Sequence, residues 1–145
     1  MNHNSKLNRP SWASYFFKIA EAVSTRSHDA QTKVGAVIVD KYNRILSTGY
    51  NGFPPGCDDD NLPNTRPEKY PFMIHAELNA IISTKVDLKE STLYTTYSPC
   101  IECAKAIAAA GIRKVYYKNN YQNSDFEFVS RFLKTCNITT EKKEE

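Results

Sequence analysis

The 145-residue sequence has no long hydrophobic run, because none of its apolar stretches approaches the ~20 residues that a helix needs to cross a bilayer. Residues 1–10 are polar and lack the apolar centre of a secretory signal. Only four cysteines are present, which does not suggest a disulfide framework in a chain of this length. These absences predict a soluble protein of the reducing cytoplasm (of the host, if a virus encodes it) without a membrane partner.

A strong excess of charge of either sign is also missing. The chain has 19 Lys and Arg against 16 Asp and Glu, a net charge of +3, and its basic residues are scattered. Nucleic-acid binding requires a basic patch, with aromatic platforms where single strands are bound. We therefore expect no nucleic-acid partner, whereas the mild positive excess suits a small anionic ligand.

The length and composition are those of one globular domain, and no internal repeat is present. We predict a single domain over residues 1–145, with residues 1–10 and 138–145 as peripheral tails.

The apolar patterns predict an α/β fold. Ser11 can cap a helix whose apolar face carries Trp12, Tyr15, Phe16, Ile19 and Val23. Two strands, 34–39 and 45–50, are expected to form a hairpin. Helices at 76–83, 101–110 and about 124–136 then alternate with strands at 91–96 and 113–117. This order predicts a mixed sheet that is covered by helices and has at least one parallel pair.

Residues 51–71 hold five of the seven prolines and show no periodicity. A segment of this length without regular structure inside a compact domain is more often functional than idle.

A metal-binding pattern follows that segment. His75-Ala76-Glu77, with Pro99-Cys100-Ile101-Glu102-Cys103 further along, matches H-x-E…P-C-x-x-C, which is typical of zinc-dependent nucleobase deaminases. His75, Cys100 and Cys103 supply three ligands, so one tetrahedral position stays open for a reactive water. Glu77 is left to move protons. Both ligand groups stand at predicted helix starts, where the partial positive charge stabilises thiolates.

A structural zinc site is the alternative interpretation, and it would need a fourth ligand. Cys57 and Cys136 are the candidates, but each is more simply a small buried residue. A structural site would also give Glu77 no role. The catalytic interpretation is therefore favoured, with one zinc ion per chain.

From about Trp12 to Cys136 the chain resembles deoxycytidylate (dCMP) deaminases, within the cytidine deaminase superfamily. The Gly49-Tyr50-Asn51-Gly52 segment and the long insertion after it indicate the mononucleotide branch, since the zinc signature alone indicates only the superfamily. The segments that carry the resemblance are 25–29, 33–38, 48–54, 56–59, 75–80 and 98–112.

The resemblance implies a three-layer cytidine-deaminase-like α/β fold, in which helices cover a central mixed sheet of about five strands. It also implies hydrolysis of dCMP to dUMP and ammonia, which feeds thymidylate synthesis. It implies that the Ala76 amide and the Ser98 carbonyl hold the base, and that Asn51 reaches the sugar hydroxyl. Arg26 and Tyr121 match residues around the 5′-phosphate.

The resemblance also implies a hexamer that is activated by dCTP with Mg²⁺ and inhibited by dTTP. The effector site would involve Gly49, Tyr50, Asn51 and Gly52. A second, structural zinc occurs in some viral members, but His28 and Cys57 offer too few soft ligands for one here.

Other interpretations remain open at this stage. Arg26 could simply be solvated, Lys33 could serve the same anion, and Asn51 could only accommodate a turn. The substrate could be free cytidine or deoxycytidine, or a base in RNA or single-stranded DNA. A non-catalytic zinc-binding interaction module is the remaining class, although such a module would not need Glu77.

Overall fold

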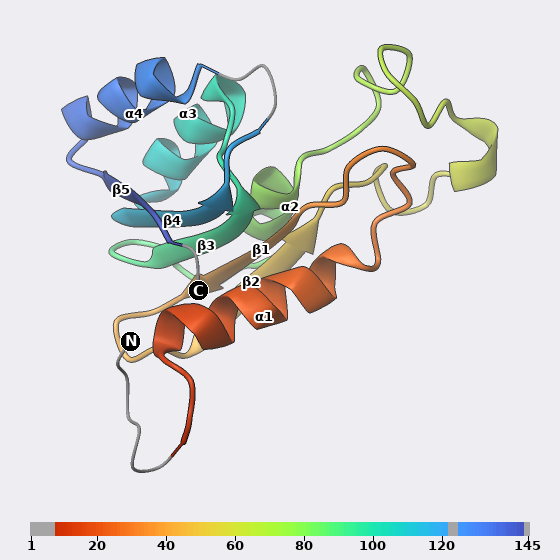
Figure 1. Cartoon of the computed structure of the whole chain (residues 1–145). Coiled ribbons are helices and arrows are strands. Elements are labelled where there is room, and N and C mark those ends of the chain that lie inside the picture. The colour runs from red at the N-terminus through yellow and green to blue at the C-terminus, as the bar shows by residue number, and fades with distance from the viewer. Residues whose placement is uncertain (1–7, 122–124, 144–145) are drawn as a thin grey trace.

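The computed structural model describes residues 8–121 and 125–143, and it confirms the predicted α/β fold. Four α-helices, one short 3-10 helix and five strands follow one another along these residues (Figure 1). Their bounds are α1 Trp12–Ser24, β1 Gly35–Val39, β2 Ile45–Tyr50, η1 Asp59–Asn61, α2 Ala76–Ile82, β3 Thr92–Tyr97, α3 Ile101–Ala110, β4 Lys114–Asn119, α4 Phe126–Thr135 and β5 Thr139–Lys142.

The strands form one mixed sheet in the order β2-β1-β3-β4-β5. β1 is antiparallel to both of its neighbours, so the predicted hairpin is present. β3, β4 and β5 are parallel to one another, and α3 and α4 connect them. Because β3 and β4 are parallel, their C-terminal ends lie at the same edge of the sheet. The candidate site lies at this edge.

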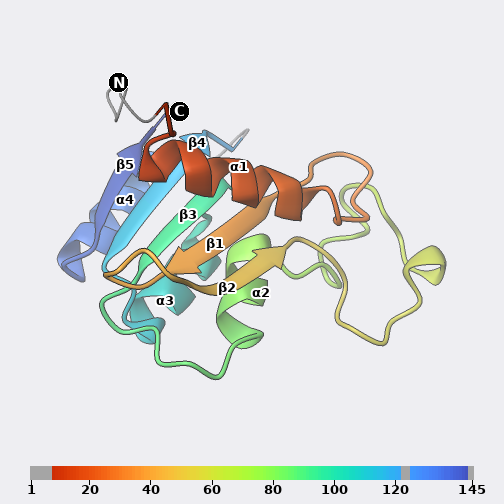
Figure 2. The same ribbon diagram turned by 90° about the horizontal axis from the view of Figure 1, so that it is seen from below.

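Helices cover both faces of this sheet, with α1 on one face and α2, α3 and α4 on the other (Figures 1 and 2). Strand β1 is buried throughout because successive side chains point into opposite layers. Ala36 and Ile38 belong to the core beneath α2–α4, whereas Val37 and Val39 pack with α1. The continuous apolar run of β1 reflects this double burial.

The buried face of α1 differs from the predicted one. Phe16, Phe17 and Ala20 contact the sheet, whereas Trp12 is 56% exposed and stacks on Phe16 with ring centroids 5.6 Å apart. The reason is a close approach at Gly35, where a Cβ atom would lie 1.8 Å from the Ala20 carbonyl oxygen. The helix therefore lies on the sheet along its Ala20 side. Ser11 caps α1 as predicted.

The expectation of a peripheral tail over residues 138–145 is wrong for its first part. Thr139–Lys142 forms the edge strand β5, and Ile138 is 3% exposed in the core. Backbone pairing with β4 holds this strand, while its side chains are mostly exposed, so no hydrophobic pattern indicated it. The last helix begins at Phe126 with Asp125 as its cap, and the predicted start at Ser124 lies outside the described residues.

Residues 51–74 leave the sheet and form a separate lobe that contains only η1 (Figure 2). A bridge between Gly52 and Ile74 closes this excursion at its base. Two side chains attach its far part to the loop before β1: the Asn64 Oδ1 atom accepts from the Ala30 amide (2.9 Å), and the Gln31 Oε1 atom accepts from the Arg66 amide (2.7 Å). Within residues 8–121 and 125–143, no helix has the length and apolar character needed to cross a membrane.

Candidate active site

The candidate site lies at one edge of the sheet. There β2, β3 and β4 end and β1 begins, as the pairings Gly35 with Tyr50, Ala36 with Thr95 and Tyr97 with Asn119 require. The segments that leave these strand ends carry Asn51, Ser98-Pro99-Cys100 and Tyr121. This topology gathers residues from distant parts of the chain.

His75, Cys100 and Cys103 meet there, as the sequence predicted. His75 is the N-cap residue of α2, Cys100 is the N-cap residue of α3, and Cys103 lies in the first turn of α3. Both sulfur atoms lie 3.4 Å from His75 Nδ1. Tetrahedral zinc with ordinary Zn–S and Zn–N bonds places such ligand atoms about 3.5 Å apart. The spacing therefore fits one zinc ion, with Nδ1 as the histidine ligand atom.

The protonation of the two thiols supports the same assignment. The Cys103 thiol donates to Cys100, which together with the hydrogen bond to His75 lowers the pKa of Cys100 to about 3 although burial opposes this. The same bond raises the pKa of Cys103. The hydrogen bond to Cys100 also raises the pKa of His75. One hydrogen bond thus shifts the pKa values of the two thiols in opposite directions, and metal binding would require both thiols to lose their protons.

Glu77 lies beside these ligands in the first turn of α2 and is 4% exposed. Burial raises the pKa of its carboxyl group to about 7, although its own backbone amide and His75 act in the other direction. Its carboxylate is not part of the three-atom ligand cluster. A carboxyl group with a pKa near the working pH is suited to both accept and donate protons.

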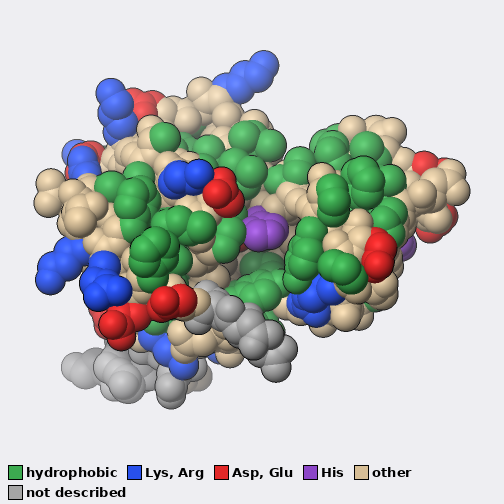
Figure 3. Space-filling view, turned by 90° about the horizontal axis from the view of Figure 1, so that it is seen from above, with side chains coloured by type: hydrophobic (Ala, Val, Ile, Leu, Met, Phe, Trp, Pro, Cys, Tyr) green, Lys and Arg blue, Asp and Glu red, His purple; other side chains and the backbone are tan. Residues whose placement is uncertain are grey.

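Glu77, His75 and Cys100 line a cavity of about 360 Å³. Figure 3 shows hydrophobic side chains on both sides of a hollow in which a histidine is visible. This volume is within the range of small-molecule sites, and its mixed lining suits a flat aromatic ring with polar edges. The lining residues are Val34, Asn51, Tyr70, His75, Ala76, Glu77, Tyr97, Ser98, Cys100, Ile101, Tyr121, Asp125, Phe128 and Val129.

Of the residues predicted to contact substrate, Asn51, Ala76, Ser98 and Tyr121 line this cavity. Arg26 does not: it is exposed just beyond the end of α1. Its phosphate role stays a prediction.

Asn51 is fixed by its surroundings. Its Oδ1 atom accepts from the Val34 amide (2.8 Å), and its Nδ2 atom donates to the Thr32 carbonyl (2.8 Å). Asn51 is therefore more than a turn residue, because its side chain ties the end of β2 to the start of β1.

The predicted effector segment, residues 49–52, lies against α2 and beside Ile74. Gly49 is buried against α2, and a Cβ atom there would lie 2.4 Å from both the Ala76 oxygen and the Ala80 nitrogen. Tyr50 is 38% exposed, while Gly52 pairs with Ile74 one residue before the histidine ligand.

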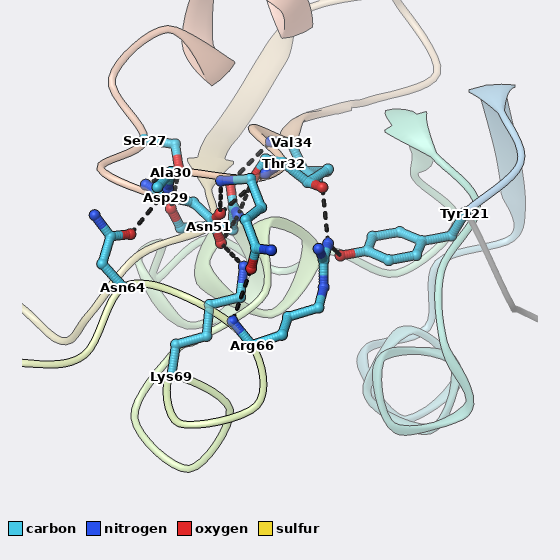
Figure 4. Close-up of polar contacts among 11 residues, drawn as sticks. Ser27, Asp29, Ala30, Thr32, Val34, Asn51, Asn64, Arg66, Lys69 and Tyr121 are labelled. Carbon is cyan, nitrogen blue, oxygen red and sulfur yellow. Dashed lines mark hydrogen bonds and ion pairs between the residues drawn. The ribbon is translucent and has the colours of Figure 1, made fainter.

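Sequence reasoning missed a buried ion pair beneath this site. Lys69 Nζ lies 2.5 Å from Asp29 Oδ2, with side chains 3% and 2% exposed. Asn51 Nδ2 also approaches Asp29 Oδ2 at 3.4 Å (Figure 4). Forty residues separate the pair in sequence, so no local pattern could indicate it. The network anchors the 51–74 lobe to the loop before β1.

The remaining cysteines differ from expectation. Cys57 is exposed and Cys136 is partly buried, so neither is the small buried residue that was predicted. His28 is exposed. Across residues 8–121 and 125–143, His75, Cys100 and Cys103 form the one cluster that could hold a metal ion.

The fold and this site define a class, the hydrolytic deaminases. The family model of the cytidine and deoxycytidylate deaminase zinc-binding region matches residues 10–119, and the chain belongs to this family.

Individual relatives agree with this assignment. Deoxycytidylate deaminase of Homo sapiens is 42% identical over 130 residues, which cover 84% of this chain and 73% of the human protein. The enzyme of Mus musculus is 41% identical over 140 residues, covering 90% and 79% respectively. The dCMP deaminase of cyanophage S-TIM5, whose structure was solved in complex with dCMP and dUMP, has a TM-score of 0.76 and 35% identity, covering 93% of this chain and 98% of the phage chain.

Proposed function

We propose that this enzyme hydrolyses dCMP to dUMP and ammonia. The observation that carries the proposal is Glu77, a buried carboxyl group beside three zinc-type ligands at the wall of a cavity of nucleotide size. Relatives named deoxycytidylate deaminases, and a phage homologue solved with dCMP and dUMP, support this substrate.

We expect His75, Cys100 and Cys103 to hold one zinc ion, whose Lewis acidity makes water nucleophilic near neutral pH. Glu77 accepts the proton of the attacking water and passes it to the ring nitrogen beside the target carbon. The oxygen adds to the target carbon, and Glu77 then takes the remaining proton of that oxygen and delivers it to the amino group. The C–N bond breaks, ammonia leaves, and a carbonyl group remains at that carbon. A pKa of about 7 suits both transfers.

The cavity residues suit the other parts of the nucleotide. The Ala76 amide belongs to the first turn of α2, whose N–H groups have no partner within the helix, so it can donate to the base. The Ser98 carbonyl would accept from the amino group of the base. Asn51 keeps one lone pair on Oδ1 for the sugar hydroxyl, and the Tyr121 hydroxyl is assigned to the 5′-phosphate.

We further propose that the enzyme supplies dUMP for thymidylate synthesis in the cytoplasm. It would form a hexamer that is activated by dCTP with Mg²⁺ and inhibited by dTTP. Gly49, Tyr50, Asn51 and Gly52 would contact the effector. The contact of Gly49 with α2 supports this coupling, since a shift of that segment would displace the helix that carries Glu77.

Free deoxycytidine is the second candidate substrate. The described residues that line the cavity include Asp125 but no Lys or Arg. A nucleoside has no phosphate group, so its binding requires no basic side chain.

An ultraviolet assay of zinc-loaded protein with dCMP, deoxycytidine, CMP and a cytosine-containing oligonucleotide tests the proposal. We expect dCMP to be the preferred substrate. Absence of dCMP turnover at one zinc per chain would refute it, and addition of dCTP or dTTP tests the regulation.

A further inference from the structure

A nucleoside monophosphate carries about two negative charges that the cavity lining does not neutralise. In the described part of the lining, Glu77 and Asp125 are acidic and no side chain is a lysine or arginine. A cation for the phosphate must therefore come from the rim of the cavity.

We propose that Arg66 is this cation and that, together with Tyr121, it makes the enzyme select a 5′-monophosphate over the free nucleoside. The inference deepens the proposed function and rests on it. Arg66 Nη2 lies 2.8 Å from Thr32 Oγ1 and 3.5 Å from the hydroxyl of Tyr121, which lines the cavity. Figure 4 shows the Arg66 side chain extending from the 51–74 lobe toward the hydroxyl group of Tyr121.

The guanidinium group has spare capacity for an anion. It carries five N–H donors, and its side-chain contacts with Thr32 and Tyr121 both involve Nη2. Within residues 8–121 and 125–143, no carboxylate forms an ion pair with it. Its planar fork matches two phosphate oxygens, whereas its present partners are neutral hydroxyl groups.

The backbone holds Arg66 in this position without any ligand. Its amide donates to the Gln31 Oε1 atom at 2.7 Å, which fixes the lobe against the loop before β1. The Lys69–Asp29 pair attaches the same lobe three residues further on. The arginine is thus preorganised, so little of the binding free energy is lost in ordering it.

Other cations near this edge of the sheet are less suitable. Lys69 is buried and neutralised by Asp29. Arg26 and Lys33 are exposed, and within the described residues neither side chain bonds to a residue that lines the cavity, whereas Arg66 contacts Tyr121.

The test compares the wild type with Arg66→Ala, Arg66→Lys and, as a matched control, Arg44→Ala, which removes an exposed arginine at the opposite end of the β1–β2 hairpin. For each protein, kcat/KM is measured with dCMP and with deoxycytidine. We expect Arg66→Ala to lower the dCMP value on the order of 10- to 100-fold and to leave the deoxycytidine value unchanged, because one charge-assisted contact is lost. Arg66→Lys should fall between, and Arg44→Ala should match the wild type.

Binding of dUMP and of deoxyuridine, measured by calorimetry, separates this inference from the deaminase proposal. The wild type could fail to turn over dCMP and still bind dUMP more tightly than deoxyuridine, with this preference lost in Arg66→Ala. The deaminase proposal would then fail, and the assignment of Arg66 to the phosphate would stand. An equal loss for both ligands in Arg66→Ala, no loss, no wild-type preference for dUMP, or a phosphate-selective loss in Arg44→Ala would each overturn the inference.

Discussion

At the scale of single residues, Glu77 combines two properties that seldom occur together in a carboxyl group. It is almost fully buried, yet it faces a cavity and has no basic side chain as an ion-pair partner within the described residues. Burial without such a partner disfavours the charged form, which explains a pKa of about 7. The placement thus converts a weak base into a group that exchanges protons at neutral pH.

Replacement of Glu77 by Gln should leave zinc binding intact and impair the deamination of dCMP. The three ligand side chains stay in place, so zinc content should remain at one per chain. Activity on dCMP should fall roughly 10²- to 10⁴-fold, since the proton carrier is lost. Elemental analysis and kcat measure the two quantities. Glu102→Gln, at an exposed position in the first turn of α3, is the control and should change neither. Loss of zinc in Glu77→Gln would assign this residue to the metal site instead.

The buried Lys69–Asp29 pair predicts a large effect on stability. Lys69→Met leaves the Asp29 carboxylate buried without its partner, which we expect to lower the free energy of unfolding by about 3–5 kcal/mol. Urea unfolding measures the change. Glu90→Gln removes the exposed ion pair with Arg113 and should have little effect. Equal effects of the two substitutions would show that the buried pair has no special role.

The same pair predicts a dependence on pH. Burial alone would raise the pKa of Asp29, but hydrogen bonds from Lys69 and from the Thr32 and Gln31 amides outweigh it and lower the pKa below the ordinary value of 3.8. The unfolded chain therefore takes up this proton at a higher pH than the native protein. The stabilisation from Asp29 is complete above 3.8 and disappears as the pH falls through the lower native value.

Unfolding free energies of the wild type and of Asp29→Asn, measured with chelator between about pH 5 and about pH 2.5, isolate this contribution. The wild type should lose more stability than the variant across that window. Parallel curves would show that another group governs acid unfolding.

At the scale of elements, the contact between β2 and α2 determines where the catalytic helix lies. Gly49→Ala would place a methyl group 2.4 Å from backbone atoms of Ala76 and Ala80, so α2 must move. We expect a loss of about 1–3 kcal/mol of stability together with reduced activity, because His75 and Glu77 move with the helix.

Gly52→Ala is the matched control for this contact, since a Cβ atom there meets nothing closer than 3.7 Å. Thermal unfolding and kcat should stay near the wild-type values in this variant. If Gly49→Ala is equally harmless, the close approach does not position the helix.

The elements also show which parts of the fold the sequence could reveal. The apolar run of β1 and the positive φ of Gly111 after α3 were predictable, because burial on both faces and a left-handed helix cap each leave a local signature. Strand β5 leaves none, since backbone pairing stabilises it while its side chains face water. The buried face of α1 was misjudged because the contact depends on Gly35, which is distant in sequence.

The candidate site also has residues that the sequence could reveal and residues that it could not. The zinc ligands and Glu77 were predictable, because the spacing of each motif within one helix start is a local property. The roles of Asp29, Arg66 and Lys69 depend on how the 51–74 lobe folds back on the loop before β1, and that packing has no short-range pattern.

At the scale of the whole molecule, the three proposed zinc ligands come from two helices that follow different strands. His75 starts α2 and Cys100 starts α3, and these helices pack in the same core against the sheet. A metal that binds only the folded arrangement stabilises it by mass action, about 2.7 kcal/mol when free zinc is 100 times its dissociation constant. Zinc should therefore contribute to stability as well as to activity.

Removal of zinc by a chelator should abolish dCMP turnover and lower the midpoint of thermal unfolding, and addition of zinc should restore both. Cys100→Ser should reproduce the chelated state permanently, because a hydroxyl group is a poor substitute for a thiolate ligand. Cys136→Ser, outside the ligand cluster, serves as the control and should retain zinc, turnover and the unfolding midpoint. A chelated wild type that unfolds at the same temperature but has lost activity would show that the helices hold their arrangement without the metal, and that zinc serves only the chemistry.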